Sequence, residues 1–132
     1  MKNYPDSSYL LYAYFNLAKS YLSNQETDKA AKIYRGIISS YNDERALQAY
    51  YKLSEIYYEK ANYNDALACC QHIIVFFPQN MSWSPKAYCL AAQSQEGLGN
   101  KEKAANLLKR MIDIYPLSKE VSRARKLLEK LK

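Results

Sequence analysis

The chain has 132 residues and a formal net charge of +6, and 48% of its residues are hydrophobic. This length fits one domain with a buried core, and the apolar content excludes a disordered chain. No run of about 18 apolar residues occurs, so we expect no membrane-spanning helix.

Apolar residues recur every three or four positions along most of the chain, a spacing typical of amphipathic α-helices. Seven helices are predicted, at about 8–22, 27–41, 42–60, 62–78, 84–98, 100–115 and 118–132. Their first N–H groups can bond to side-chain oxygens of Thr27, Asn42 or Asp43, Asn62 or Asn64, Ser84, Asn100 and Ser118. Gly99 follows the fifth helix and can take the left-handed conformation that ends a helix.

A block of about 30 residues recurs three times, marked by an alanine that opens the second half of each predicted helical hairpin. These alanines are Ala30, Ala66 and Ala104, which lie 36 and 38 residues apart. A repeat of this period indicates that each hairpin packs only on its neighbours. We therefore expect an elongated superhelix with a long exposed surface.

The residues around these alanines resemble the tetratricopeptide repeat, in which two antiparallel helices cross closely at small residues. The matching residues are Tyr14, Leu17, Ala18, Tyr21, Ala30, Tyr34 and Ile37, then Tyr50, Leu53, Ser54, Tyr57, Ala66, Cys70, Ile73 and Pro78, then Tyr88, Ala91, Ala92, Gln95, Ala104, Leu108, Met111 and Pro116. The third copy departs from the pattern, because Ala91 replaces the usual leucine and Gln95 the usual tyrosine. The resemblance implies an all-α, right-handed superhelix of three helix-turn-helix hairpins, at about 11–44, 47–80 and 85–118, within one domain spanning 1–132.

The last predicted helix, 118–132, carries one apolar stripe and is otherwise mostly basic. An open repeat stack needs a terminal element that is apolar inward and polar outward. We therefore interpret this segment as a capping helix. No such element precedes the first hairpin, which indicates a missing upstream repeat or self-association at that end.

The hairpin connectors Tyr4-Pro5-Asp6-Ser7 and Tyr115-Pro116-Leu117-Ser118 resemble those of bacterial cell-envelope members of the family, of the Tol-Pal accessory and outer-membrane assembly lipoprotein types. Tyr4-Pro5 looks like the end of a preceding hairpin, so we expect the chain to be a piece of a longer protein. Residues 1–20 lack the pattern of an export signal. The resemblance favours the periplasm, whereas the three unpaired-looking cysteines favour a reducing compartment.

In this family the first helix of each hairpin lines the concave face and contacts partner peptides or helices. The positions that match are Tyr12, Phe15, Lys19, Leu22, Gln48, Tyr51, Glu55, Tyr58, Glu59, Lys86, Gln93 and Glu96. Tyr12, Phe15, Tyr51 and Tyr58 would be large, rigid contact groups, unless they pack between helices instead. The resemblance thus implies a protein-interaction scaffold with a protein or peptide partner.

Charge is uneven along the chain and leaves two alternatives open. Residues 1–66 carry eight basic and eight acidic side chains, whereas residues 67–132 carry eleven and five, so the whole excess of +6 lies in the second half. A basic surface attracts nucleic acid or an anionic surface, although no nucleic-acid-binding motif accompanies it and we do not expect nucleic acid as the partner. Homodimerisation through the front layer is the other alternative.

Residue types that carry catalysis, metals or cofactors are sparse. His72 is the single histidine and stands mid-helix without a nucleophile pattern. Cys69, Cys70 and Cys89 lack metal-site spacing and are interpreted as free thiols packed like small apolar residues. With no glycine-rich phosphate loop, we expect a protein that is not an enzyme and has no cofactor or metal site.

Overall fold

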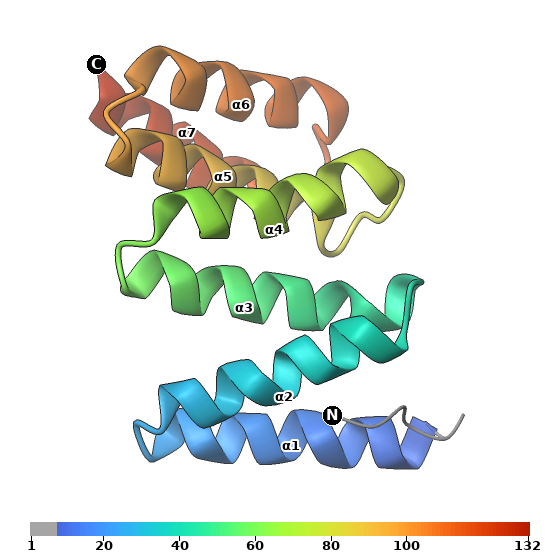
Figure 1. Ribbon diagram of the computed structural model, residues 1–132. Coiled ribbons are helices and arrows are strands. Elements are labelled where there is room, and N and C mark those ends of the chain that lie inside the picture. The colour runs from blue at the N-terminus through green and yellow to red at the C-terminus, as the bar shows by residue number, and fades with distance from the viewer. Residues whose placement is uncertain (1–7) are drawn as a thin grey trace.

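The structure, a computed structural model, describes residues 8–132 and contains only helices in that part of the chain (Figure 1). The helices are α1 (Ser8–Ser23), α2 (Thr27–Ser40), α3 (Leu47–Glu59), α4 (Tyr63–Phe76), α5 (Ser84–Gly97), α6 (Lys101–Ile114) and α7 (Val121–Leu131), with a 3-10 turn, η1 (Glu44–Ala46), before α3. Each matches one predicted segment, so the all-α prediction is confirmed. The connector Tyr4–Ser7 lies outside the described residues. No helix among residues 8–132 has the length and apolar content needed to cross a bilayer.

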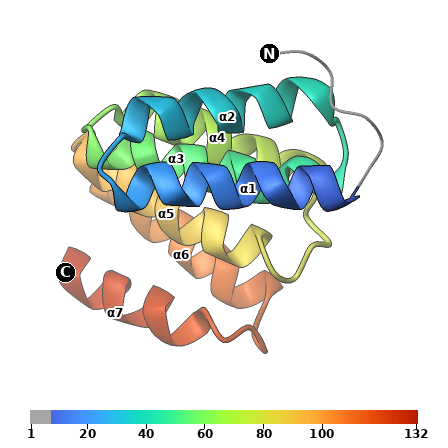
Figure 2. The same cartoon turned by 90° about the horizontal axis from the view of Figure 1, so that it is seen from below.

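Each helix packs antiparallel on the next, and the three hairpins form successive layers (Figure 1). The first and last helices make no substantial contact. Viewed along the stack in Figure 2, the later helices are progressively displaced from the earlier ones, so the layers build a curved superhelix. The arrangement is the nearest-neighbour stack expected from the repeat.

The core is correspondingly divided into three clusters, each made by consecutive helices. The first joins α1, α2 and α3, the second joins α3, α4 and α5, and the third joins α5, α6 and α7. The apolar stripe of α7 closes the third cluster through Val121 and Ala124, which are 7% and 0% exposed. The capping role predicted for this helix follows from that burial.

Small residues allow the two helices of each hairpin to approach closely. All six are buried at 2% exposure or less: Ala18, Ala30, Ser54, Ala66, Ala92 and Ala104. In the middle hairpin the hydroxyl of Ser54 donates to the backbone carbonyl of Tyr51 at 2.6 Å, so this polar side chain needs no partner across the interface.

The turn inside each hairpin has the same backbone geometry in all three repeats. The N–H groups of Glu26, Asn62 and Asn100 each donate, at 2.8 Å, to a carbonyl five residues earlier. The residue before each of these donors has a positive φ: 62° at Gln25, 60° at Ala61 and 85° at Gly99. Only the third repeat places glycine there, which confirms the left-handed end predicted at Gly99.

Replacing Ala61 with glycine is therefore expected to stabilise the protein by about 0.5 to 1 kcal/mol, because the Cβ strain at positive φ exceeds the entropy that glycine adds to the unfolded chain. Urea denaturation followed by circular dichroism measures the change. Ala68 is exposed within α4, and Ala68→Gly should instead destabilise by about 1 kcal/mol. A destabilised A61G variant would contradict the turn geometry.

Several helix starts differ from the sequence prediction because other groups satisfy the first N–H donors. Helix α5 has no side-chain cap; the Asn80 side-chain oxygen accepts from the N–H groups of Ser82 and Trp83 in the turn before it, at 3.0 and 2.8 Å. The Ser84 hydroxyl instead donates to the carbonyl of Phe77, at 2.5 Å. Ser118 accepts from the N–H of Glu120 at 3.1 Å, which forms a turn that delays α7 until Val121.

Other expected caps lie at the right place but act differently. Thr27 is the first residue of α2 and not its cap, and Asn62 and Asn100 hold the cap positions without a side-chain bond to the helix. The amide of Asn100 donates to the Gln95 side chain at 3.0 Å. Asp43 is a cap as predicted, but it caps η1, accepting from the Arg45 N–H at 3.0 Å.

Candidate functional site

The odd-numbered helices line the inner face of the curved stack. Helix α5 contacts both α3 and α7 directly, whereas the even-numbered helices make no comparably extensive contact with one another. Equivalent helices approach on the inside of a curve and separate on its outside. The inner face is therefore formed by α1, α3, α5 and α7, and the outer face by α2, α4 and α6.

The twelve residues predicted to contact a partner differ widely in accessibility. Tyr12, Lys19, Glu59 and Glu96 are exposed; Phe15, Leu22, Gln48, Glu55, Tyr58, Lys86 and Gln93 are half-buried; and Tyr51 is buried. The exposed side chains at the α1 end of the face include Tyr12, which is 68% exposed. The accessible part of the predicted set is thus mostly charged, apart from Tyr12.

A hollow of about 300 Å³ lies between the C-terminal ends of α1 and α3. Its apolar lining comes from Leu22 and Ile56, and its polar lining includes Lys52, Glu55 and Glu59. Lys52 and Glu55 form an ion pair of 3.6 Å on the α3 surface. The structure therefore brings together three of the predicted residues around a small apolar spot with mixed charge.

At one position of the inner face, burial rises from the first repeat to the third, whereas the equivalent residues Leu22, Tyr58 and Glu96 are half-buried, half-buried and exposed. Phe15, Tyr51 and Cys89 occupy equivalent positions, 36 and 38 residues apart. Phe15 is half-buried, Tyr51 is 6% exposed and Cys89 is 0% exposed. The contacts of α5 with α3 and of α7 with α5 accompany the burial of the second and third residues, so at this position the inner face is most accessible on α1.

The prediction that Tyr51 is an accessible contact residue is corrected by its packing. Its ring lies 5.5 Å from that of Trp83, measured between centroids, in the core cluster of α3, α4 and α5. Burial raises the pKa of the Tyr51 hydroxyl, and the nearby Arg123 guanidinium offsets part of this increase. The ammonium group of Lys86 lies 4.8 Å from the centre of the Trp83 ring, so this predicted contact residue is also engaged within the fold.

Arg123 reaches from α7 across the inner face. Its guanidinium donates to the Gln93 side-chain oxygen at 2.9 Å and lies 3.7 Å from the Glu120 carboxylate. Burial alone would lower the pKa of Arg123, but its interactions with Tyr51 and other acidic groups raise the pKa overall. The arginine links α7 to α5 at the C-terminal part of the inner face.

Sequence reasoning missed Arg123 because α7 was treated only as a cap. A signal was present, since Arg123 lies 34 residues after Cys89, close to the 36- and 38-residue spacings that relate Phe15, Tyr51 and Cys89. Helix α7 takes the place of the first helix of a fourth repeat, and its inner position carries a cation. A cap with this geometry shapes the inner face as well as closing the core.

Replacing Arg123 with alanine is expected to lower the free energy of unfolding by about 1 to 2 kcal/mol, because it removes a charge-assisted hydrogen bond and a packed side chain. Arg125 on the same helix is exposed and serves as the matched control, with an expected change below about 0.5 kcal/mol. Urea denaturation gives both values. Equal losses in the two variants would show that the contacts of Arg123 contribute no stability.

The remaining reactive residue types are packed within the fold. The His72 ring stacks on that of Tyr50, with centroids 4.1 Å apart and planes at 16°. The three cysteines are free; Cys70 and Cys89 are buried and Cys69 is half-buried. In the described part of the chain, no three His, Cys, Asp or Glu side chains are grouped as a metal site would require.

Comparison with known proteins gives a family and a fold. The family model described as tetratricopeptide repeat matches residues 12–43, 48–80 and 87–118. The TPR domain of Arabidopsis OM64 is similar in structure: the TM-score is 0.70, the sequences are 18% identical, and the match covers 92% of this chain and 95% of that domain. No curated protein sequence matches the chain. The family matches span most of the chain, and it therefore belongs to the tetratricopeptide repeat family.

Proposed function

We propose that the chain is a non-catalytic scaffold that binds a peptide or helix of a partner protein on the inner face, at the end formed by α1 and α3. Members of this family generally mediate protein–protein interactions. The main observation behind the assignment to this end is the burial of Tyr51 and Cys89 compared with the half-buried Phe15, together with the hydrogen bond by which Arg123 joins α7 to α5 at the other end. The hollow between α1 and α3 offers apolar surface within a charged rim, a composition typical of peptide-binding sites.

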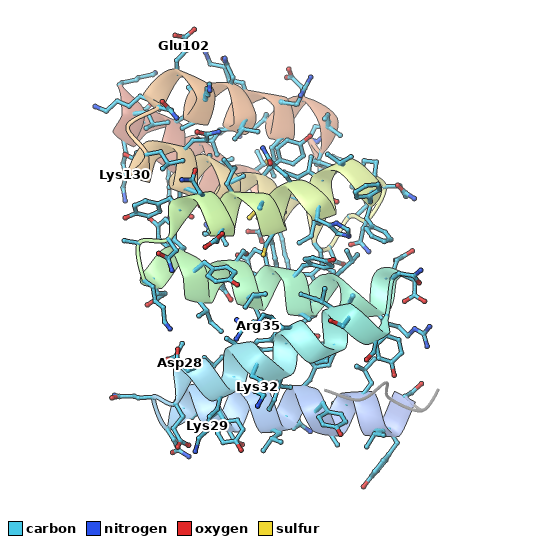
Figure 3. The ribbon with its side chains drawn as sticks, in the orientation of Figure 1. Asp28, Lys29, Lys32, Arg35, Glu102 and Lys130 are labelled. Carbon is cyan, nitrogen blue, oxygen red and sulfur yellow. The ribbon has the colours of Figure 1, made fainter. Side chains whose placement is uncertain are left out.

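Site-specific photo-cross-linking tests this proposal. A photoreactive amino acid replaces Lys19 or Glu59 on the inner face, or Lys32 or Glu102 on the even-numbered helices, in cells of the source organism. Figure 3 shows Lys32 on α2 and Glu102 at the start of α6. We expect partner cross-links at the two inner positions and background levels at the two outer ones. Cross-links confined to the outer positions would refute the proposal.

Charge reversal at matched positions then measures the contribution of the hollow. Glu59→Lys changes its rim, whereas Glu102→Lys makes the same charge change on an exposed residue of α6. We expect the first variant to weaken binding of the cross-linked partner at least tenfold and the second to leave it within twofold. Equal affinities for the two variants would remove the α1–α3 hollow from the interface.

Self-association through α1 is a second candidate function. It is favoured by apolar side chains on the solvent-exposed side of this helix. Tyr9 is 80% exposed and Leu17 is 43% exposed, and with Ala13 they follow one another at intervals of four residues along one stripe of the helix. A dimer through this stripe would leave the α1–α3 hollow free. Light scattering over a concentration series should then detect dimers that Leu17→Glu abolishes, and a monomer at all concentrations would exclude the dimer.

A further inference from the structure

A second hollow lies on the outer face, away from the proposed partner site. It has a volume of about 620 Å³ and runs between α4 and α6, with α5 as its floor. We call it the outer groove. Its floor includes Ala91 and Gln95, its walls include Ile74 and Leu107, and none of its lining residues is acidic.

Two residues at the floor of the outer groove depart from the repeat pattern. Shifting each position back by 38 residues gives the equivalent site between α2 and α4, where Leu53 stands for Ala91 and Tyr57 for Gln95. Both replacements remove side-chain volume from the floor. Ala91 and Gln95 are 0% and 9% exposed, so a larger side chain at either position has to project into the groove or displace its neighbours.

A second difference concerns the side chain above the floor. In the earlier repeat His72 covers the equivalent space, with its ring stacked 4.1 Å from that of Tyr50. Arg110 replaces His72 one repeat later, and Tyr88 packs instead towards Tyr115, with ring centroids 5.9 Å apart. The stacked lid of the earlier repeat is therefore absent, and a flexible cation lies at the edge of the open groove.

The chemistry of the outer groove combines an apolar surface with two exposed cations. Val75 on the α4 wall is 63% exposed, an unusual degree for a valine. Lys103 and Arg110 on the α6 side form no ion pair with any described residue. They stand seven residues apart on one helix, which places their Cα atoms about 10 Å apart. The groove therefore offers apolar contact and two separated sites for negative charge.

We propose that the outer groove binds an acidic peptide segment of another protein, one with an apolar side chain between two carboxylates about 10 Å apart. This separation corresponds to three residues of an extended chain or seven residues of a helix. Asn106 and Gln71 line the same groove and offer amide groups to the peptide backbone. An apolar wall and only two cations favour a peptide over nucleic acid, for which stacking aromatic side chains and more phosphate contacts are expected.

Peptide selection with a filled-groove variant tests the proposal without knowledge of the natural partner. A displayed library of random twelve-residue peptides is selected on the wild-type chain and counter-selected on Ala91→Leu, which restores the side chain of the earlier repeat. We expect enriched peptides with net negative charge and at least one large apolar residue. Recovery of no such peptide after counter-selection would overturn the proposal.

Fluorescence anisotropy of the enriched peptides then identifies the contacts. The double variant K103E/R110E should weaken binding at least tenfold, and it keeps the proposal testable if A91L does not fold. The double variant K109E/K126E makes the same charge change at exposed residues outside the groove and should alter binding less than threefold. Similar losses in both would show a general charge effect and refute a specific site.

Two further measurements distinguish a peptide site in the outer groove from a nucleic-acid site there and from binding on the inner face. The first measurement compares the affinity of a labelled twelve-nucleotide single strand for K103E/R110E and for K109E/K126E. We expect the two affinities to differ by no more than tenfold. If the groove variant loses oligonucleotide binding selectively and the peptides do not bind, the groove is a nucleic-acid site and the peptide proposal fails. Glu59→Lys should leave the enriched peptides bound within twofold, so loss of the inner-face function and loss of outer-groove binding are distinguishable.

Discussion

Replacing Ile73 with alanine should lower the free energy of unfolding by about 2 to 5 kcal/mol, the range for a large-to-small change at a fully buried position. Ile73 is 0% exposed and lies in the core cluster that joins α3, α4 and α5. The first and third core clusters are connected only through this middle cluster. Removing the Ile73 side chain therefore weakens the link between the two ends of the stack. We also expect a lower dependence of the unfolding free energy on urea, as the transition loses cooperativity.

Leu128→Ala provides the control for this experiment. Leu128 is half-buried on α7 and contacts only the last core cluster. Its loss should lower the free energy of unfolding by about 1 kcal/mol, in proportion to the smaller buried apolar area. Urea titrations monitored by circular dichroism give both the free energy and its urea dependence. Equal effects of the two substitutions would argue against a stack held together by its middle layer.

Two buried thiols, those of Cys70 and Cys89, should by themselves contribute about 4 kcal/mol of destabilisation when the pH is raised from 8.5 to 10.5. Burial raises the pKa of Cys70 from 9.0 to about 12 and that of Cys89 from 9.0 to about 11. A thiol whose pKa is raised by folding ionises first in the unfolded state. Its full contribution to stability is therefore present only below its pKa in the unfolded state. This contribution is therefore complete below about pH 9 and is lost as the pH rises towards 11 or 12.

The double variant C70A/C89A should reverse the order of stability across this pH range. At pH 7.5 we expect it to be less stable than the wild type by about 1 kcal/mol per site, because small apolar volume is lost. At pH 10.5 it should be the more stable protein, since its unfolded state gains no thiolate at these positions. Urea denaturation at several pH values measures this crossover, and parallel pH profiles would contradict the role of the thiols.

Helix positions and repeat boundaries were accessible from sequence because they depend on local patterns. The spacing of apolar residues and the recurrence of Ala30, Ala66 and Ala104 require only neighbouring residues to be interpreted. Cap identity was less predictable, because several side chains near a helix start can accept the same N–H groups. Ser84 is the clearest case, since its hydroxyl donates to the Phe77 carbonyl and α5 begins without a side-chain cap.

The accessibility of the inner face could be predicted only in part. Family resemblance identified the helices that line it, but not how far the superhelix closes. Tyr51 was expected as an accessible aromatic residue, yet the approach of α5 and the packing of Trp83 bury it. Arg123 is the opposite case, because a residue on the presumed cap reaches Gln93 on the preceding odd-numbered helix.

The sequence by itself determined that the chain forms seven helices in three repeated hairpins with a terminal cap, because periodicity, small crossing residues and turn residues act over short distances. It also showed Ala91 and Gln95 as departures from the pattern. Only the tertiary structure decided that these residues form the floor of an outer groove and that Arg123 bonds to Gln93 at the far end of the inner face. Such spaces depend on the relative placement of three helices that are distant in sequence, which follows from packing of the whole stack.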